Sequence, residues 1–160
     1  MNTKLKKALG LHRPRLSLAI ICCGVALHFA FPRYIVATGS MVPTIRPGSY
    51  VVACRLPLLP TSIGKNDVVV FKPVEGISSA PWMHRIVADA GEQVAPPDRI
   101  GRVDISTEAR AQHLKGATDP LVVPNSSFYQ SGDSATSYHG LVAKELAIAK
   151  VLFHFKLPWR

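Results

Sequence analysis

The sequence predicts a mainly β domain, preceded by one N-terminal transmembrane helix. Residues 16–31, LSLAIICCGVALHFAF, form an apolar run without Asp, Glu, Lys or Arg. The rest of the chain has short β-branched runs separated by turn-forming residues, which is typical of strands in a β domain. With 160 residues, 48% of them hydrophobic, the chain can form one domain with its own core besides the membrane segment.

Two interpretations of the apolar run compete, a cleaved secretory signal and an uncleaved signal anchor. No small-x-small cleavage site follows it, because Pro32, Arg33 and Tyr34 come next. The anchor is therefore favoured. Sixteen helical residues rise about 24 Å, less than the ~30 Å hydrocarbon core, so the bilayer would thin locally or the helix would extend at its ends.

Positive charge before the run predicts the topology. Five cationic residues and no acid precede it: Lys4, Lys6, Lys7, Arg13 and Arg15. By the positive-inside rule, residues 1–15 are a cytoplasmic flank, residues 16–33 the anchor, and residues 34–160 a domain beyond the membrane. The predicted location is the inner (cytoplasmic) membrane, with a single pass, a periplasmic or extracellular domain, and the lipid bilayer as a partner.

The net charge of +9 does not indicate a nucleic-acid partner, because the excess lies mostly in the N-terminal flank. From Tyr34 to the end there are 13 Lys+Arg against 10 Asp+Glu, and no stripe of Arg and aromatic residues. No metal-site spacing of His and Cys occurs, so no metal and no cofactor is expected. Cys54 is expected to be a buried free thiol.

Short β-branched runs predict strands at residues 50–54, 67–71, 83–87, 121–123 and 127–130. Residues 99–119 are polar and are expected to form a substructure inserted in the sheet, with a short helix over residues 107–115. Residues 143–155 fit either a strand pair or a helix, and their periodicity does not decide between them.

Ser40 is the candidate nucleophile. It lies in Thr38-Gly39-Ser40-Met41-Val42-Pro43-Thr44, nine residues beyond the end of the apolar run, where it would attack substrates held at the bilayer surface. A serine hydroxyl needs a nearby base to become reactive at neutral pH. Neither Gly-x-Ser-x-Gly nor Ser-x-x-Lys occurs at Ser40, so the base must come from elsewhere in the chain.

Four blocks follow one another along the chain. The first is the Ser40 segment with Pro47-Gly48, and the second is Gly64–Lys72, with Asn66 and Asp67 before Val-Val-Val-Phe. The third is Met83–Val87 followed by Gly91–Val94, and the fourth is Ser131–Ser134 followed by Gly140–Val142. In this order the blocks resemble the type I signal peptidase family: its nucleophile segment, its G-D-(I/V)-V-V-F strand with Asn66 for the usual Gly, its base segment K-R-V…G-D-x-V, and its G-D-N…S…G-x-V block. The resemblance implies a signal-peptidase-like antiparallel β-sheet domain.

By this resemblance His84 is the general base. Most bacterial members have Lys at that place, whereas the eukaryotic endoplasmic-reticulum and archaeal branches have His. A Lys base must be desolvated to lower its pKa by several units, while His starts near 6.5 and already titrates close to neutral pH. The alternative is that His84 is an ordinary buried strand histidine.

The resemblance also assigns the groups around the base and the oxyanion. A His base usually needs an acceptor that fixes its tautomer. Asp133 is the only acid of the fourth block, and it is either that acceptor or a turn residue. If it is a turn residue, Ser134 or Ser137 would hydrogen-bond the base instead. The N–H of Ser40 and the hydroxyl of Thr38 are the expected oxyanion donors.

The predicted function is that of a membrane-bound serine endopeptidase, which cleaves signal or leader peptides from exported precursor proteins. The substrate would lie extended along an exposed strand, with small side chains next to the cut as the family prefers. The short chain and compact spacing most resemble the conjugative-transfer, TraF-like branch, whose members process pilins or other transfer components, so secretion or conjugation machinery is a further expected partner. Within the family, a general preprotein peptidase is the nearest alternative. The alternative is a catalytically inactive, membrane-anchored protein that binds peptides or an assembly partner.

Overall fold

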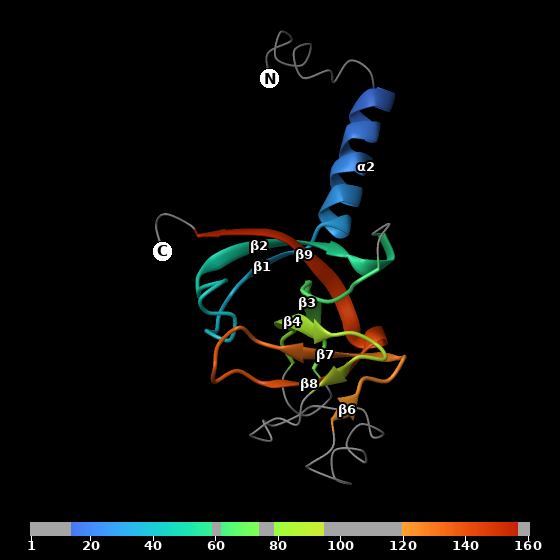
Figure 1. Ribbon diagram of the computed structural model, residues 1–160. Helices are drawn as coiled ribbons and strands as arrows, with labels where there is room; N and C mark the ends of the chain where they lie inside the picture. The colour runs from blue at the N-terminus through green and yellow to red at the C-terminus, as the bar shows by residue number, and fades with distance from the viewer. Residues whose placement is uncertain (1–13, 59–61, 74–78, 95–119, 157–160) are drawn as a thin grey trace.

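A seven-stranded antiparallel sheet forms the body of the protein in the computed structural model, which describes residues 14–58, 62–73, 79–94 and 120–156. The strand order is β1-β2-β9-β3-β4-β7-β8 (Figure 1). The strands are β1 (Arg33–Ile35), β2 (Ser49–Arg55), β3 (Val68–Phe71), β4 (Trp82–Ala88), β7 (Ser127–Ser131), β8 (His139–Ala143) and β9 (Ala147–Lys156). A smaller sheet pairs β5 (Gln93–Val94) with β6 (Leu121–Val122). The prediction of a mainly β, antiparallel domain is confirmed.

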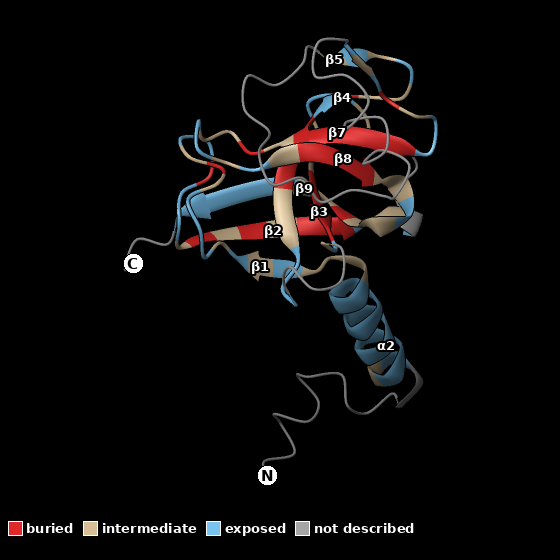
Figure 2. Cartoon of the chain, turned by 90° about the horizontal axis from the view of Figure 1, so that it is seen from below, coloured by how far each residue is buried: buried red, intermediate tan, exposed pale blue. Residues whose placement is uncertain are grey.

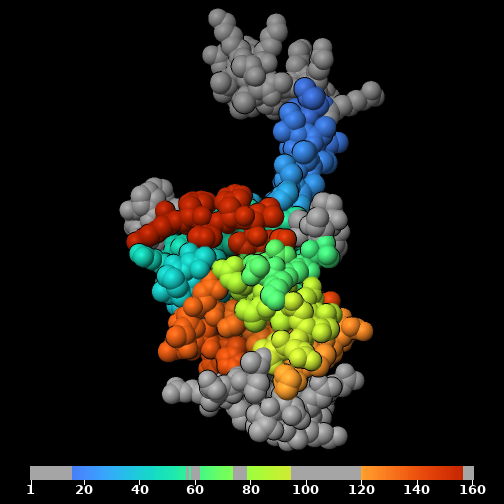
Figure 3. Space-filling view, in the orientation of Figure 1, coloured from blue at the N-terminus to red at the C-terminus, as the bar shows by residue number. Residues whose placement is uncertain are grey.

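Helix α2 (Pro14–Ala30) precedes the sheet and projects away from it (Figures 1 and 3). Its large apolar side chains are exposed: Leu16, Leu18, Ile20, Ile21, Val25, Leu27 and Phe29. It meets the body at its C-terminal end, where Arg55 Nε donates a hydrogen bond to the Phe29 carbonyl at 3.1 Å. Arg33, the last residue of the predicted anchor, already lies in β1. Among the residues described, no helix has the length and apolar character needed to cross a membrane.

All five predicted strands are confirmed, as β2, β3, β4, β6 and β7, to within one residue at each end. Two 3₁₀ turns are present, η1 (Leu56–Leu58) after β2 and η2 (Lys144–Leu146) after β8. The C-terminal segment that follows η2 is a strand: β9 runs for ten residues between β2 and β3. The helix alternative for it is wrong, because its residues pair with β2 and, in its first half, also with β3. The helix expected over residues 107–115, and the inserted substructure at 99–119, lie outside the described residues. Cys54 is a buried free thiol, as predicted.

Strand β3 lies near the middle of the sheet and is buried on both faces, which explains its uninterrupted apolar sequence. On one face, Val69 and Phe71 pack with Ile86, Phe128 and Val142. On the other, Val70 packs with small residues of β2 and β9. Figure 2 shows that β7 and β8 are also largely buried, whereas β9 is mostly intermediate or exposed. His84 is the register partner of Val69, so its side chain lies on the first of these faces, against the apolar core.

Candidate active site

Ser40 lies in the turn-rich loop between β1 and β2. The side chains of Met41 and Ile45 in this loop are 0% and 1% exposed and pack with Val51 of β2, so they hold the loop against the sheet. The Val42 N–H donates to the Gly39 carbonyl at 3.0 Å, which closes a turn around the serine. The nucleophile candidate is thus half-buried on a loop with its own apolar anchors.

The groups around Ser40 come from both sides of the site. Thr38 Oγ1 lies 3.5 Å from Ser40 Oγ, where the sequence places an oxyanion donor. From the loop after β7, the Ser134 N–H donates to the Ser40 carbonyl at 2.9 Å. This second contact joins the fourth sequence block to the first and limits how far the nucleophile's peptide can move.

His84 projects from β4 into a nearly dry environment. It is 2% exposed, and the rings of Phe71 and Trp82 lie 5.9 and 5.8 Å from its imidazole, centroid to centroid. Its ring makes two hydrogen bonds: Nδ1 with Gln130 Oε1, and Nε2 with Ser137 Oγ at 3.4 Å. Since an amide oxygen only accepts, the first bond places the ring proton on Nδ1 and leaves a lone pair on Nε2.

The electrostatics of the site favour neutral His84. Burial lowers the pKa of the imidazole below its ordinary value of 6.5, while the hydrogen bond with Gln130 and the negative charge of Asp133 oppose that change in part. A His with a lowered pKa is unprotonated at neutral pH. His84 can therefore accept a proton at Nε2 there.

Asp133 makes its strongest contacts with Arg85, the residue after the candidate base. Arg85 Nε and Nη2 donate to the two carboxylate oxygens at 2.9 and 2.7 Å, and this bidentate pairing lowers the pKa of Asp133. The Thr44 hydroxyl also hydrogen-bonds the carboxylate. Asp133 thereby connects β4 to the loop that carries Ser40. Its effect on His84 is through charge, since Gln130 occupies Nδ1.

The sequence interpretation missed Gln130. Among the described residues it is the hydrogen-bond partner of His84 Nδ1, and it is 3% exposed on β7. One signal was present: in Ser127–Ser131, SFYQS, a glutamine follows two aromatic residues in a strand that must be buried. A buried amide needs a hydrogen-bond partner, but its identity depends on the neighbouring strand.

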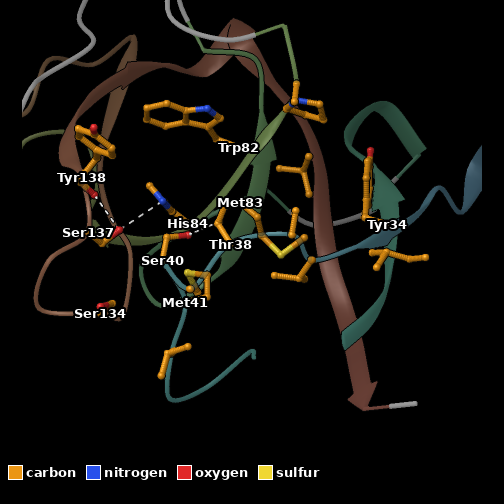
Figure 4. A pocket seen from close by; sticks show the side chains of 18 of the residues that line it. Tyr34, Thr38, Ser40, Met41, Trp82, Met83, His84, Ser134, Ser137 and Tyr138 are labelled. Carbon is orange, nitrogen blue, oxygen red and sulfur yellow. Dashed lines mark hydrogen bonds between the residues drawn. The ribbon is translucent and has the colours of Figure 1, made fainter. Parts of the chain in front are cut away.

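Five of the six predicted site residues line a pocket of about 980 Å³: Thr38, Ser40, His84, Ser134 and Ser137. Figure 4 shows Ser40 and His84 pointing into it, with Trp82 and Tyr138 forming one wall. Asp133 is not among its lining residues. Over the described ranges no direct hydrogen bond joins Ser40 Oγ to His84: Ser40 Oγ pairs with Thr38 Oγ1, and His84 Nε2 with Ser137 Oγ. The same part of the chain shows no cluster of His, Cys, Asp or Glu suited to a metal ion.

Gly132 occupies a position that leaves no room for a side chain. A Cβ there would lie 2.4 Å from the Ser40 carbonyl oxygen and 1.9 Å from Ser137 Oγ. The Ser137 hydroxyl can rotate, but the Ser40 oxygen belongs to the backbone and can move only with the loop. The close approach of the fourth block to the nucleophile therefore requires glycine.

We expect Gly132→Ala to separate the loop after β7 from Ser40 and to lower kcat by about a hundredfold, because small displacements of reacting groups are costly. Stability should fall by roughly 1–3 kcal/mol from overpacking. Both are measured by precursor cleavage and thermal unfolding. Gly64→Ala is the matched control, since its Cβ would meet the Asp89 carboxylate at an ordinary 3.8 Å. Equal activity of the two variants would contradict the packing argument.

Together, a loop serine and a buried neutral histidine in one pocket of an antiparallel sheet define a candidate serine hydrolase. The family described as "Signal peptidase, peptidase S26" matches residues 12–119, and the chain belongs to this family. The match covers the first three sequence blocks, while the fourth, at residues 131–142, lies beyond it. No curated protein sequence matches the chain. Membership indicates a serine peptidase acting on substrates that carry signal peptides.

Proposed function

We propose that the chain is a membrane-anchored serine endopeptidase that removes signal or leader peptides from exported precursors. The observation that carries the proposal is the shared pocket, which Ser40 and Thr38 line together with a buried His84 whose Nε2 lone pair faces the Ser137 hydroxyl. Family membership supports the substrate class.

In the proposed mechanism Ser40 Oγ attacks the scissile carbonyl carbon and its proton passes to His84 Nε2. The Ser40 N–H and Thr38 Oγ1 donate to the oxyanion that forms. His84 then gives the proton to the leaving amine, and an acyl-enzyme remains on Ser40. A water molecule deprotonated by His84 hydrolyses that ester and restores the free serine. Ser137 must release Nε2 before the first step, and such catalytic contacts often tighten only when substrate binds.

The proposed anchor is the apolar segment that contains α2, with the N-terminus cytoplasmic and the sheet domain on the far side of the inner membrane. The exposed apolar side chains of the helix support it, because water is a poor solvent for so many of them. The 17 residues of α2 rise about 25 Å, so a bilayer of ~30 Å hydrocarbon would have to thin around them. Arg33 of β1 and Arg55 of β2, which hydrogen-bond the last turns of the helix, would then face the headgroups.

We also place the protein in the conjugative-transfer, TraF-like branch, with pilins or other transfer components as substrates. The supporting observation is the compact spacing of the four blocks. Comparison of cleavage of a pilin precursor with that of a general exported precursor tests this assignment. Preference for the general precursor would remove it.

One experiment tests function and anchoring together. The full chain in lipid vesicles should cleave a membrane-held precursor, and a flexible spacer of about twenty residues inserted between Phe31 and Pro32 should reduce that cleavage about tenfold or more. The insertion keeps the Pro32 carbonyl, which accepts from the Ala53 N–H at 3.0 Å, with the sheet. Hydrolysis of a short soluble peptide should persist, because the pocket is unchanged.

The outcomes separate the alternatives. Equal loss in both arms would mean that the spacer damaged the fold, and an unchanged rate in both would contradict the role of membrane proximity. A wild-type protein that binds the peptide but neither cleaves it nor reacts with a serine-directed acylating probe would be the catalytically inactive binding protein.

A further inference from the structure

We propose that Gln130 is the positioning residue of the site, which holds His84 as the Nδ1–H tautomer through an uncharged amide. The proposal rests on the proposed function, since it assigns the partner of the candidate base. It is carried by the His84–Gln130 hydrogen bond and by the enclosure of both residues, which are 2% and 3% exposed.

Sheet register brings the two residues together. Gln130 is the Cα partner of Ile86 across β4 and β7, and His84 is two residues along β4 on the same face. The contact is thus a diagonal one between neighbouring strands, within reach of long side chains. Rigid strands position a catalytic group better than a loop does, so this bond fixes the ring as well as the tautomer.

The orientation of the amide decides whether His84 can act as a base. With Oε1 facing Nδ1, the ring carries its proton on Nδ1 and offers the Nε2 lone pair to the pocket. If the amide NH₂ faced Nδ1 instead, the proton would lie on Nε2, and the ring could not accept one from Ser40. The proposal commits to the first arrangement.

An amide differs from a carboxylate in what it does after proton transfer. A carboxylate would stabilise the imidazolium strongly, whereas an amide oxygen does so weakly. The groups around His84 in the described structure supply little other charge: Phe71 of β3 and Trp82 of β4 present rings, and Ser137 presents a hydroxyl. The charge of Asp133 opposes the lowering of the His84 pKa only in part, and that carboxylate is ion-paired with Arg85. We therefore expect catalysis to persist to more acidic pH than it would with a carboxylate at position 130.

The test compares wild type with Gln130→Met, which keeps the length of the side chain without an acceptor, and Gln130→Glu, which adds charge. Ser127→Ala is the matched control, because Ser127 is another buried polar residue of β7. Histidine-ring ¹⁵N NMR of the full chain in detergent micelles reads the tautomer, and the His84 signal is assigned by its loss in His84→Ala. Cleavage of a soluble peptide as a function of pH gives kcat and KM.

In wild type and Ser127→Ala, we expect the neutral His84 ring to carry its proton on Nδ1. Gln130→Met should release both the tautomer and the position of the ring, and the displaced ring should lower kcat by about a hundredfold with KM unchanged. Gln130→Glu should move the acid limb of kcat to higher pH by roughly one to two pH units. A purely packing role would not move that limb.

A wild-type ring protonated on Nε2 would overturn the proposal, and so would a Gln130→Met protein with an unchanged tautomer and kcat. If Gln130→Met does not fold, the wild-type tautomer and the Gln130→Glu limb decide. The NMR result does not depend on activity. If His84 carries its proton on Nδ1 in a protein that cleaves nothing, the proposed function is contradicted. The role of Gln130 in holding that tautomer would still stand.

Discussion

Ser40→Ala should abolish precursor cleavage, with a loss of at least about a thousandfold, because removal of a serine nucleophile leaves only binding and oxyanion stabilisation. The fold should be unaffected: among the described residues the Ser40 hydroxyl forms its hydrogen bond with Thr38 Oγ1, and Met41 and Ile45 still anchor the loop. Cleavage is measured by gel shift of a precursor, and folding by thermal unfolding, which should change by no more than a degree or two.

Ser134→Ala is the control for that variant. Ser134 lines the same pocket, but its contact with Ser40 is made by the backbone N–H, which alanine keeps. A serine-directed acylating probe should label wild type and Ser134→Ala and leave Ser40→Ala unlabelled. Labelling at Ser137 would contradict the assignment and move the nucleophile to the hydroxyl that already contacts His84 Nε2.

His84→Ala is the second change expected to have a large effect. Without the base, Ser40 is not deprotonated at neutral pH, so cleavage should fall about a thousandfold or more. The variant should also be less stable by roughly 2–4 kcal/mol, because it leaves a cavity and a buried Gln130 oxygen without its donor. Cleavage and denaturant unfolding measure the two effects.

The control is His139→Ala, since His139 bonds the Tyr129 hydroxyl at 2.7 Å and does not line the pocket. It should retain cleavage within a few-fold. Near wild-type cleavage by His84→Ala would end the Ser40–His84 assignment and leave Lys72 as the next basic side chain to test.

The stability difference between wild type and His84→Ala should also depend on pH. Burial lowers the native pKa of His84 below 6.5, so the unfolded chain takes up a proton first as pH falls. The stability that neutral His84 contributes is complete above pH 6.5 and is lost as pH falls from there through the native pKa. The two proteins should accordingly converge in stability in acid, and a constant difference would contradict a buried neutral ring.

Strand periodicity explains why the predicted strands were correct and also why β1 and β8 were among those missed. Strand β3 is apolar throughout, and β4 alternates between buried and more exposed residues. Such patterns are local and can be recognised in the sequence alone. Strand β1 has only three residues, two of them exposed, and β8 contains Gly140. Each is an edge strand and is held in the sheet by its single neighbour, a fact that no local pattern reports.

The sequence by itself determined the mainly β class, the apolar N-terminal segment and five residues that line one pocket, because apolar periodicity and short motifs are properties of contiguous residues. Which polar groups meet was decided only by the tertiary structure. Asp133 pairs with Arg85 and Thr44, Gln130 pairs with His84, and Gly132 admits the Ser40 carbonyl. These contacts depend on the register of β4 against β7, which shifts at a bulge between Ile86 and Ala88. A one-residue change in register would turn these side chains to opposite faces of the sheet, and the local sequence does not reveal where the shift occurs.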